Sequence, residues 1–282
     1  MSKQRYRGRD RPFFTERRPH SAAVLLLFAM SAHAVTTLGP SSATQTVSTD
    51  TSYLIKPGTA ITTSSGNAIN VEGIAPVTMS NAGSIISSTD NIAAAVVFDV
   101  PGSLVNQVSG AALGHTHGIL FNNNGAANNI VNRGDVSARI SHAITYLGAA
   151  SGTVDNFGTL NANSAVTAST DGILLGSTGN VTVNNHAGAV IRSGMGDQDN
   201  GSGILVSAGT ALIGNDGLID AYHEGILGRS GLPMEVRNGA TGVIRSTIGR
   251  ACGSKAGARS ITPASLPAGR KRPFCYSART TS

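Results

Sequence analysis

The sequence predicts an all-β protein, a right-handed parallel β-helix (solenoid) of about eight coils. The main evidence is a short unit in which Asn is followed, after one to three residues, by Gly and then by an aliphatic residue two positions later. The unit recurs every 24 to 30 residues, and self-similarity at such a period indicates a solenoid. The clearest copies are Asn81-Ala-Gly83-Ser-Ile85, Asn132-Arg-Gly134-Asp-Val136, Asn156-Phe-Gly158-Thr-Leu160 and Asn215-Asp-Gly217-Leu-Ile219.

Each unit predicts a turn followed by a short strand. Asn and Gly tolerate left-handed backbone conformations, so Asn-x-Gly predicts a turn. Alternation of aliphatic with small or polar residues after the glycine predicts a strand with one buried face. The repeat glycines are Gly58, Gly83, Gly110, Gly134, Gly158, Gly188, Gly217 and Gly242. The aliphatic residues two positions after them are Ile85, Val136, Leu160, Val190, Ile219 and Ile244.

Two further strand signals occur within most units. One is a small residue followed by Ile, and the other is an apolar pair shortly before the next Asn. Examples are Gly118-Ile-Leu, Ala143-Ile-Thr, Gly172-Ile-Leu, Gly203-Ile-Leu and Gly225-Ile-Leu for the first, and Val77-Thr-Met, Val181-Thr-Val and Ala211-Leu-Ile for the second. Three strands per unit is the plan of a parallel β-helix. Aromatic residues make up 4% and Trp is absent, which favours stacked aliphatic side chains over a sandwich core, the alternative all-β fold.

The two ends differ from the repeats. Residues 1–34 predict a signal peptide, with a basic start, an apolar run over residues 22–30 and the cleavage signal Ala32-His-Ala34. The apolar run is short for a membrane span, which favours a cleaved signal. Residues 35–57 are expected to lead into and cap the first coil, residues 58–248 to form the repeats, and residues 249–282 to form a basic, disordered tail.

The formal net charge of +6 misrepresents the repeats. The first 20 and the last 34 residues hold seven Lys or Arg each, which leaves seven basic residues against 13 acidic ones between them. The body is therefore near −6, and a nucleic-acid partner is not expected, since such a partner requires a basic face on the folded protein. Both cysteines, Cys252 and Cys275, lie in the tail. They either form a disulfide that staples a loop, or belong to out-of-frame residues after a truncation.

A signal peptide, Gly/Asn/Thr-rich β-helix repeats and few cysteines together resemble the passenger domains of bacterial autotransporters, the type V secretion family. The resemblance covers residues 35–248 and is closest at Asn156-Phe-Gly-Thr-Leu and Asn215-Asp-Gly-Leu-Ile. It implies a surface-exposed or released protein, commonly an adhesin, exported through a C-terminal outer-membrane β-barrel. No strands for such a barrel follow Arg250. We therefore expect a truncated passenger, periplasmic as it stands and at the cell surface or extracellular if part of a full autotransporter.

One motif suggests binding. Arg133-Gly134-Asp135 matches the triplet that engages integrins, and Gly134 places it at a predicted turn. Arg and Asp are also ordinary residues of solvated turns, so both interpretations stay open.

Metal binding has two weak candidates. Asp197 and Asp199 cluster oxygen ligands suited to calcium, although the spacing is that of neither an EF-hand nor a calcium-binding β-roll. His115-Thr-His117 would place two imidazoles on one face of a strand, half of a metal site. The alternatives are a protruding polar loop and ordinary loop histidines.

The sequence contains no catalytic constellation and predicts no cofactor. The leading hypothesis is an exported, non-enzymatic, monomeric β-helix that binds a host-surface protein or glycan. The alternatives are a secreted carbohydrate-active β-helix, which would need three or more carboxylates stacked on adjacent coils, and a non-functional truncated product.

Overall fold

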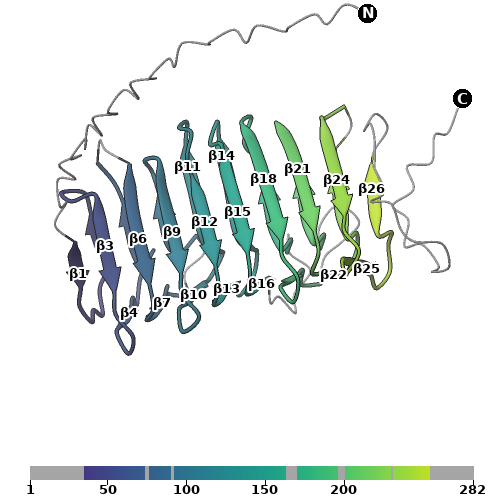
Figure 1. Cartoon of the computed structure of the whole chain (residues 1–282). Helices are drawn as coiled ribbons and strands as arrows, with labels where there is room; N and C mark the ends of the chain where they lie inside the picture. The colour runs from purple at the N-terminus through teal and green to yellow at the C-terminus, as the bar shows by residue number, and fades with distance from the viewer. Residues whose placement is uncertain are drawn as a thin grey trace, which may run out of the picture. The chain divides into compact units, whose positions relative to one another are not determined.

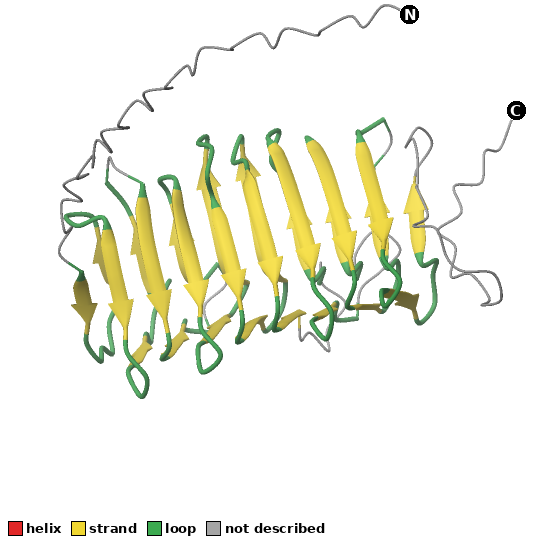
Figure 2. Ribbon diagram, in the orientation of Figure 1, coloured by secondary structure: helices red, strands yellow, loops and turns green. Residues whose placement is uncertain are grey.

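The computed structural model of the chain describes residues 35–73, 76–89, 92–162, 170–195, 201–229 and 231–254. Within these residues the regular secondary structure is entirely strand, with no helix (Figure 2). The strands pair in parallel and form three sheets, which confirms the all-β, parallel β-helix prediction (Figure 1). The right-handed sense stays an expectation, based on the general preference of parallel crossover connections. The predicted signal peptide, residues 1–34, lies outside the described residues.

The chain visits the three sheets in the order A, B, C. Sheet A contains β1 (Thr36–Leu38), β3 (Ser52–Ile55), β6 (Val77–Asn81), β9 (Gly102–Asn106), β12 (Asn129–Asn132), β15 (Gly152–Asn156), β18 (Asn180–Asn185), β21 (Thr210–Asn215) and β24 (Met234–Asn238). Sheet B contains β4 (Ala60–Thr62), β7 (Ser84–Ile86), β10 (Ala111–Gly114), β13 (Asp135–Ala138), β16 (Thr159–Ala162), β19 (Val190–Arg192), β22 (Leu218–Ala221) and β25 (Val243–Ser246). Sheet C contains β2 (Gln45–Val47), β5 (Ile69–Val71), β8 (Ala94–Phe98), β11 (His117–Asn123), β14 (His142–Gly148), β17 (Ile173–Leu175), β20 (Ile204–Val206), β23 (Ile226–Gly228) and β26 (Cys252–Ser254).

Eight coils, β3–β5 to β24–β26, each give one strand to every sheet and follow a partial first coil of β1 and β2. The paired strands run from Thr36 to Ser254, so they extend beyond the predicted repeat range, 58–248, at both ends. Cys252 in β26 is disulfide-bonded. The only other cysteine, Cys275, lies outside the described residues. In the part of the chain that the structure describes, no helix has the length and hydrophobicity needed to cross a membrane.

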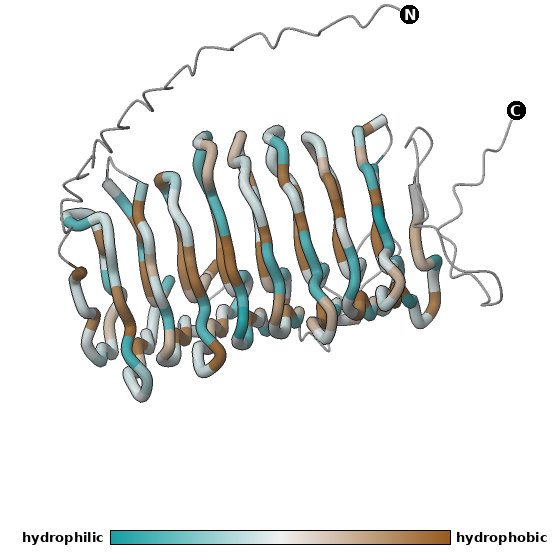
Figure 3. The backbone as a smooth tube through the Cα atoms, viewed as in Figure 1, coloured by the Kyte–Doolittle hydropathy of each residue, from teal (hydrophilic) through white to brown (hydrophobic). Residues whose placement is uncertain are grey.

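Inward-facing side chains stack into ladders that run through the coils. Figure 3 shows the resulting alternation of hydrophobic and hydrophilic residues along the strands. The sheet A ladder consists of Tyr53, Met79, Leu104, Ile130, Val154, Val183, Ile213 and Val236. The sheet C ladder consists of Ile69, Val96, Ile119, Ile144, Ile173, Ile204, Ile226 and Cys252. All of these side chains are buried.

The few aromatic residues include one buried stack. Phe98, Phe121 and Tyr146 occupy equivalent positions in β8, β11 and β14, and successive ring centroids are 4.8 Å apart. The Tyr146 hydroxyl donates to the carbonyl oxygen of Asn128 at 2.6 Å, which satisfies the buried polar end of this ring.

The asparagine of each repeat unit is the last residue of a sheet A strand, with its side chain packed inside the solenoid. The side-chain amide of each one donates to the amide oxygen of the next, over N···O distances of 2.7 to 2.9 Å. This asparagine ladder consists of Asn81, Asn106, Asn132, Asn156, Asn185, Asn215 and Asn238. The ladder begins at Asn81, because the equivalent residue of the preceding coil is Ile55. The asparagines therefore join the coils to one another.

The reason predicted for the repeat glycines is wrong at most positions. Only Gly58 and Gly188 of the eight have a positive φ, and none of the ladder asparagines does. The other repeat glycines are required because neighbouring backbone is too close for a side chain. A Cβ on Gly158, for example, would lie 2.2 Å from the carbonyl oxygen of Gly134.

The predicted register is wrong in one coil. Val190 does not face the core there; Ile191 does, fully buried and paired with Leu160 and Ile219. The turn before β19 has four residues, 186–189, so Gly188 lies one position before the equivalent of Gly158. The same one-residue shift turns Arg192, four positions after Gly188, to the outer face, where it pairs with Asn161 and Asp220.

Candidate binding surface at the corner between sheets A and B

The turns that connect sheet A strands to sheet B strands form one long edge of the solenoid, here called the A–B corner. Except in the first full coil, where the turn follows Ile55, each turn follows a ladder asparagine, and the next residue lies at least partly at the surface. Two-residue turns at 133–134 and 157–158 are flanked by four-residue turns at 107–110 and 186–189. The predicted triplet Arg133, Gly134 and Asp135 occupies the first of the two short turns and the start of β13.

The triplet is exposed but held by backbone hydrogen bonds to the coils on both sides. The Arg133 N–H donates to the Asn106 carbonyl at 2.8 Å, and the Asp135 N–H donates to the Gly110 carbonyl at 3.0 Å. On the other side, the Gly134 carbonyl accepts from Thr159 at 2.9 Å. The side chains of Arg133 and Asp135 are exposed. The triplet is thus a fixed corner of the solenoid, and its integrin-type binding stays a prediction.

An aromatic ring stands exposed beside the triplet. Phe157 is 47% exposed, and its ring lies parallel to the His186 imidazole with centroids 3.9 Å apart. The Arg133 guanidinium carbon lies 5.5 Å from the centroid of the same ring, within the range of a cation–π contact. These three side chains come from consecutive coils and all directly follow a ladder asparagine. The stack fixes the orientation of Phe157 at the surface.

Polar groups surround the stack on the adjoining end of sheet A. The Asp155 carboxylate accepts from the Asn184 amide at 2.9 Å and lies 3.3 Å from the His186 ring nitrogen Nε2. On the other side of the corner Asp135 is exposed as a residue, but neighbouring atoms partly desolvate its carboxyl and raise its pKa. The surface therefore combines one positive group, two acidic groups and an aromatic ring. We define the binding surface as Arg133, Gly134, Asp135, Asp155, Phe157 and His186.

Sequence reasoning missed a second polar cluster, at the corner between sheets B and C. His117 and His142 pair across β11 and β14, and their rings stack with centroids 5.7 Å apart. Asp171 follows in the next coil, where its N–H donates to His142 Nδ1 at 3.2 Å. One carboxylate oxygen of Asp171, Oδ1, accepts from the Ser202 N–H at 2.8 Å. We call His117, His142, Asp171 and Ser202 the B–C column.

A signal for the B–C column was present in the sequence. Each member directly precedes the Gly-Ile or Ala-Ile pair that begins a sheet C strand core. Glu224 precedes the next such pair, and the Gly203 N–H donates to its carbonyl. Carboxylates at these equivalent positions are thus separated by a coil that carries Ser202. The three consecutive carboxylates that a carbohydrate-active β-helix would need do not occur at these described positions.

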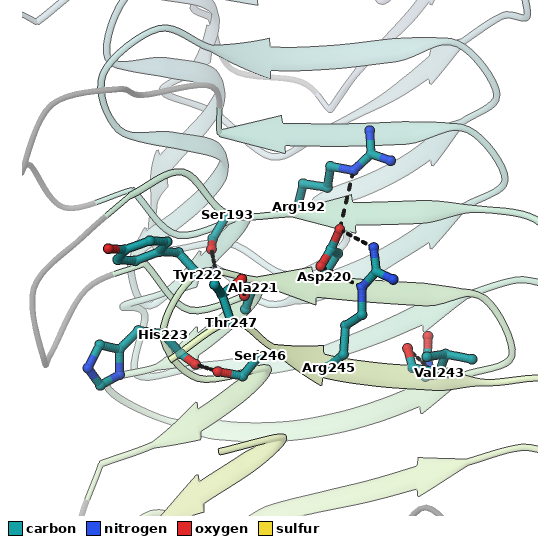
Figure 4. A network of polar contacts seen from close by, with 11 residues as sticks. Arg192, Ser193, Asp220, Ala221, Tyr222, His223, Val243, Arg245, Ser246 and Thr247 are labelled. Atoms are coloured by element: carbon teal, nitrogen blue, oxygen red, sulfur yellow. Dashed lines mark hydrogen bonds and ion pairs between the residues drawn. The ribbon is translucent and has the colours of Figure 1, made fainter. Parts of the chain in front are cut away.

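A third group of polar contacts lies on the last coils, in part on the outer face of sheet B (Figure 4). Asp220 in β22 accepts two hydrogen bonds of 2.8 Å from Arg245 in β25 and lies 3.7 Å from Arg192 in β19. The hydrogen bonds from Arg245, with the positive charges of both arginines, hold the pKa of Asp220 below its usual range. The Tyr222 N–H donates to the Ser193 hydroxyl at 2.8 Å nearby. Because both arginines are exposed and the charges pair with one another, we assign this group a minor structural role.

The metal predictions have separate outcomes. Asp197 and Asp199 lie outside the described residues. The predicted pair His115 and His117 does not share a strand, because β11 begins at His117 and His115 lies in the preceding turn. Among the residues that the structure describes, no three His, Cys, Asp or Glu side chains are placed to hold a metal ion.

Comparison of the chain with protein-family models, with curated proteins and with solved structures gave no match.

Proposed function

We propose that the chain is an exported, non-enzymatic β-helical binding protein of the adhesin type, with the A–B corner as its binding surface. The observation that carries this proposal is the exposed ring of Phe157, held between Arg133 and His186. Aromatic and Arg side chains are enriched where proteins recognise partners, and a preorganised ring loses little entropy on binding. The regular backbone of the solenoid favours a broad contact surface over an enclosed active site.

The proposed partner is a protein or glycan on the surface of a host cell. The proposed binder is a monomer and needs no cofactor. Its body, near −6 in charge, disfavours nucleic acid. Residues 1–34 direct export, to the periplasm, or to the cell surface where an outer-membrane translocation barrel is supplied. N-terminal sequencing of periplasmic protein tests this step: a mature chain starting at Val35 supports export, and an uncleaved cytoplasmic chain contradicts it.

Binding is tested with the fluorescently labelled mature chain on cultured epithelial cells and on a glycan array. We expect Phe157→Ala to weaken binding at least about tenfold, which corresponds to about 1.4 kcal/mol. Val243→Ala is the matched control, because Val243 is also a large apolar residue and 48% exposed. Equal loss in both variants, or no binding by the parent chain, contradicts the proposal.

Two further variants separate the classes of partner. Asp135→Glu keeps the charge but changes the reach of the carboxylate, so a partner that recognises the Arg133–Asp135 triplet loses affinity. Binding of a glycan that packs against the edge of the Phe157 ring should be insensitive to Asp135→Glu but weakened by Phe157→Ala. Measuring the affinity of the parent chain and of Asp135→Glu for purified integrin tests recognition of the triplet directly.

A further inference from the structure

The most unusual chemistry of the molecule is buried in the B–C column. Asp171 is fully buried, and the His142 side chain is 5% exposed. Asp171 Oδ1 accepts the Ser202 N–H, whereas Oδ2 has no hydrogen-bond partner. His142 Nδ1 lies 3.4 Å from Oδ2. An unpaired carboxylate oxygen in such a place is costly, because burial removes its hydration.

The hydrogen bonds around the pair show that a proton is needed between these two atoms. His142 Nδ1 accepts the Asp171 N–H at 3.2 Å, so in this arrangement it carries no proton. Nδ1 and Oδ2 then face each other with lone pairs only. A single proton on Oδ2, sharing the Nδ1 lone pair with the Asp171 N–H, converts this repulsion into a hydrogen bond and leaves the pair with no net charge. On Nδ1 the same proton would take the place of the Asp171 N–H.

We propose that His142 and Asp171 share one buried proton, and that this proton makes the junction between the β14 coil and the β17 coil pH-sensitive. While the proton is present, the pair joins the two coils with no uncompensated charge. When it leaves to solvent, a buried carboxylate remains opposite a neutral imidazole, and the junction weakens.

The surroundings favour the proton on Asp171. Burial raises the pKa of Asp171 to about 7, against backbone hydrogen bonds from Ser202 and Gly201 and the charge of Arg229. Burial, together with the neighbouring His117, lowers the pKa of His142 to about 3, against the hydrogen bond with the Asp171 backbone. Two coils after Asp171, beyond the coil of Ser202, His223 and Glu224 contact each other, which limits their effect on the pair. Between pH 4 and 6 the pair therefore holds one proton.

The sign of the pH dependence follows from the Asp171 carboxyl. Its pKa is 3.8 when unfolded and about 7 when folded, so the folded state binds one more proton between these values. Stability contributed by this group is fully present below pH 3.8 and is lost as the pH rises to about 7. The histidines act in the opposite direction, so the Asp171 contribution must be isolated by substitution.

Asp171→Asn isolates it, since the Asn amide can donate where Oδ2 held the proton while its oxygen still accepts from Ser202. We measure melting temperature from pH 4 to pH 8 on the full chain, for the parent, for Asp171→Asn and for the control Asp99→Asn, an exposed carboxyl. We expect the Asp171→Asn chain to match the parent near pH 4 and to melt about 10 °C higher at pH 8. Asp99→Asn keeps the parent profile.

A difference that is constant with pH overturns the proposal, as does an Asp171→Asn chain that becomes less stable than the parent toward pH 8. If Asp171→Asn does not fold, the parent chain still decides the question through the carboxyl ¹³C shift of Asp171. A titration midpoint near 7 supports a retained proton, whereas an ionised carboxyl at pH 5 contradicts it.

Discussion

Each member of the asparagine ladder satisfies several backbone and side-chain groups with one buried amide. Asn132, for example, donates both to the amide oxygen of Asn156 and to the Thr159 carbonyl, at 2.9 and 3.0 Å. Its own amide oxygen accepts from Asn106. An aspartate would lack the donor, and an aliphatic residue would lack both groups. A hydroxyl has a single hydrogen, so it could not donate to both groups as the Asn amide does.

Asn132→Ala should therefore destabilise the chain by about 3 kcal/mol. Two buried neighbours, the Asn106 amide and the Asn156 amide oxygen, each lose a partner, at about 1–3 kcal/mol per group. Urea denaturation followed by circular dichroism measures the change. The control is Asn180→Ala, because Asn180 is an exposed residue at the start of β18. A cost below that of the control would show that the ladder does not stabilise the coils.

His117 gives the second prediction at this scale. Burial lowers its pKa from 6.5 to about 4, so the unfolded state binds one more proton between these values. Stability contributed by His117 is therefore present above pH 6.5 and is lost as the pH falls to about 4. His117→Gln should reduce the fall in melting temperature between pH 6.5 and pH 4. The exposed-site control His186→Gln, whose imidazole is 37% exposed, should not; equal slopes in the two variants would contradict the prediction.

The residue scale is where prediction from the sequence was least complete. The role of Asn was missed because a turn preference and a buried ladder give the same Asn-x-Gly spacing. The B–C column was missed because the connections between sheets B and C differ in length. His142 to Asp171 spans 29 residues, while His117 to His142 spans 25. If the repeat units had been aligned on the Gly-Ile and Ala-Ile pairs instead of on the repeat glycines, the residues of the B–C column would have fallen at one position.

At the scale of one element, the length of the A–B turn affects which residue can stand at its last position, directly before the sheet B strand. The position equivalent to Gly158 is Thr59 in the first full coil and Ala189 in the coil of β18. Both of these exceptions lie in four-residue turns, at 56–59 and 186–189. The two-residue turns have glycine there, because the backbone of the preceding coil occupies the space that a Cβ would need.

Gly158→Ala should consequently cost about 1–3 kcal/mol, as overpacking does in a close-packed interior. The contact atom is the Gly134 carbonyl oxygen, which cannot rotate away as a flexible side chain would. Gly39→Ala is the matched control, because a Cβ there meets no atom within 4 Å. Its effect should stay within about 0.5 kcal/mol. Equal melting temperatures for the two variants would show that the turn can shift.

Strand positions were the most predictable elements. The residues Gly118-Ile, Gly172-Ile and Gly203-Ile all lie at the starts of sheet C strands as predicted, since Ile alternation and a close-packed glycine coincide there. Val190 was wrongly predicted to face the core because, in the four-residue turn 186–189, the glycine lies one position further from the strand than in the two-residue turns. Turn length is set by contacts with the adjacent coil, which a single repeat does not encode.

For the molecule as a whole, each coil forms its strand hydrogen bonds only with the coils next to it. Stability in such a solenoid is approximately a sum over coils and their interfaces. The asparagine ladder, the aliphatic ladders and the B–C column all cross these interfaces. At the A–B corner, the same stacking places Arg133, Phe157 and His186 in line without any loop having to fold by itself.

Amide hydrogen–deuterium exchange of the full chain tests the central claim most directly, that coils from β3 to β26 form one hydrogen-bonded solenoid. Strands with partners on both sides should exchange slowly, in three protected segments per coil, with fast exchange at the A–B turn residues 108–109 and 187–188. Protection should be strongest in the central coils and weaker in β1 and β26, which lie at sheet edges. Fast exchange throughout residues 77–221, or protection without the three-segment period, would contradict the account.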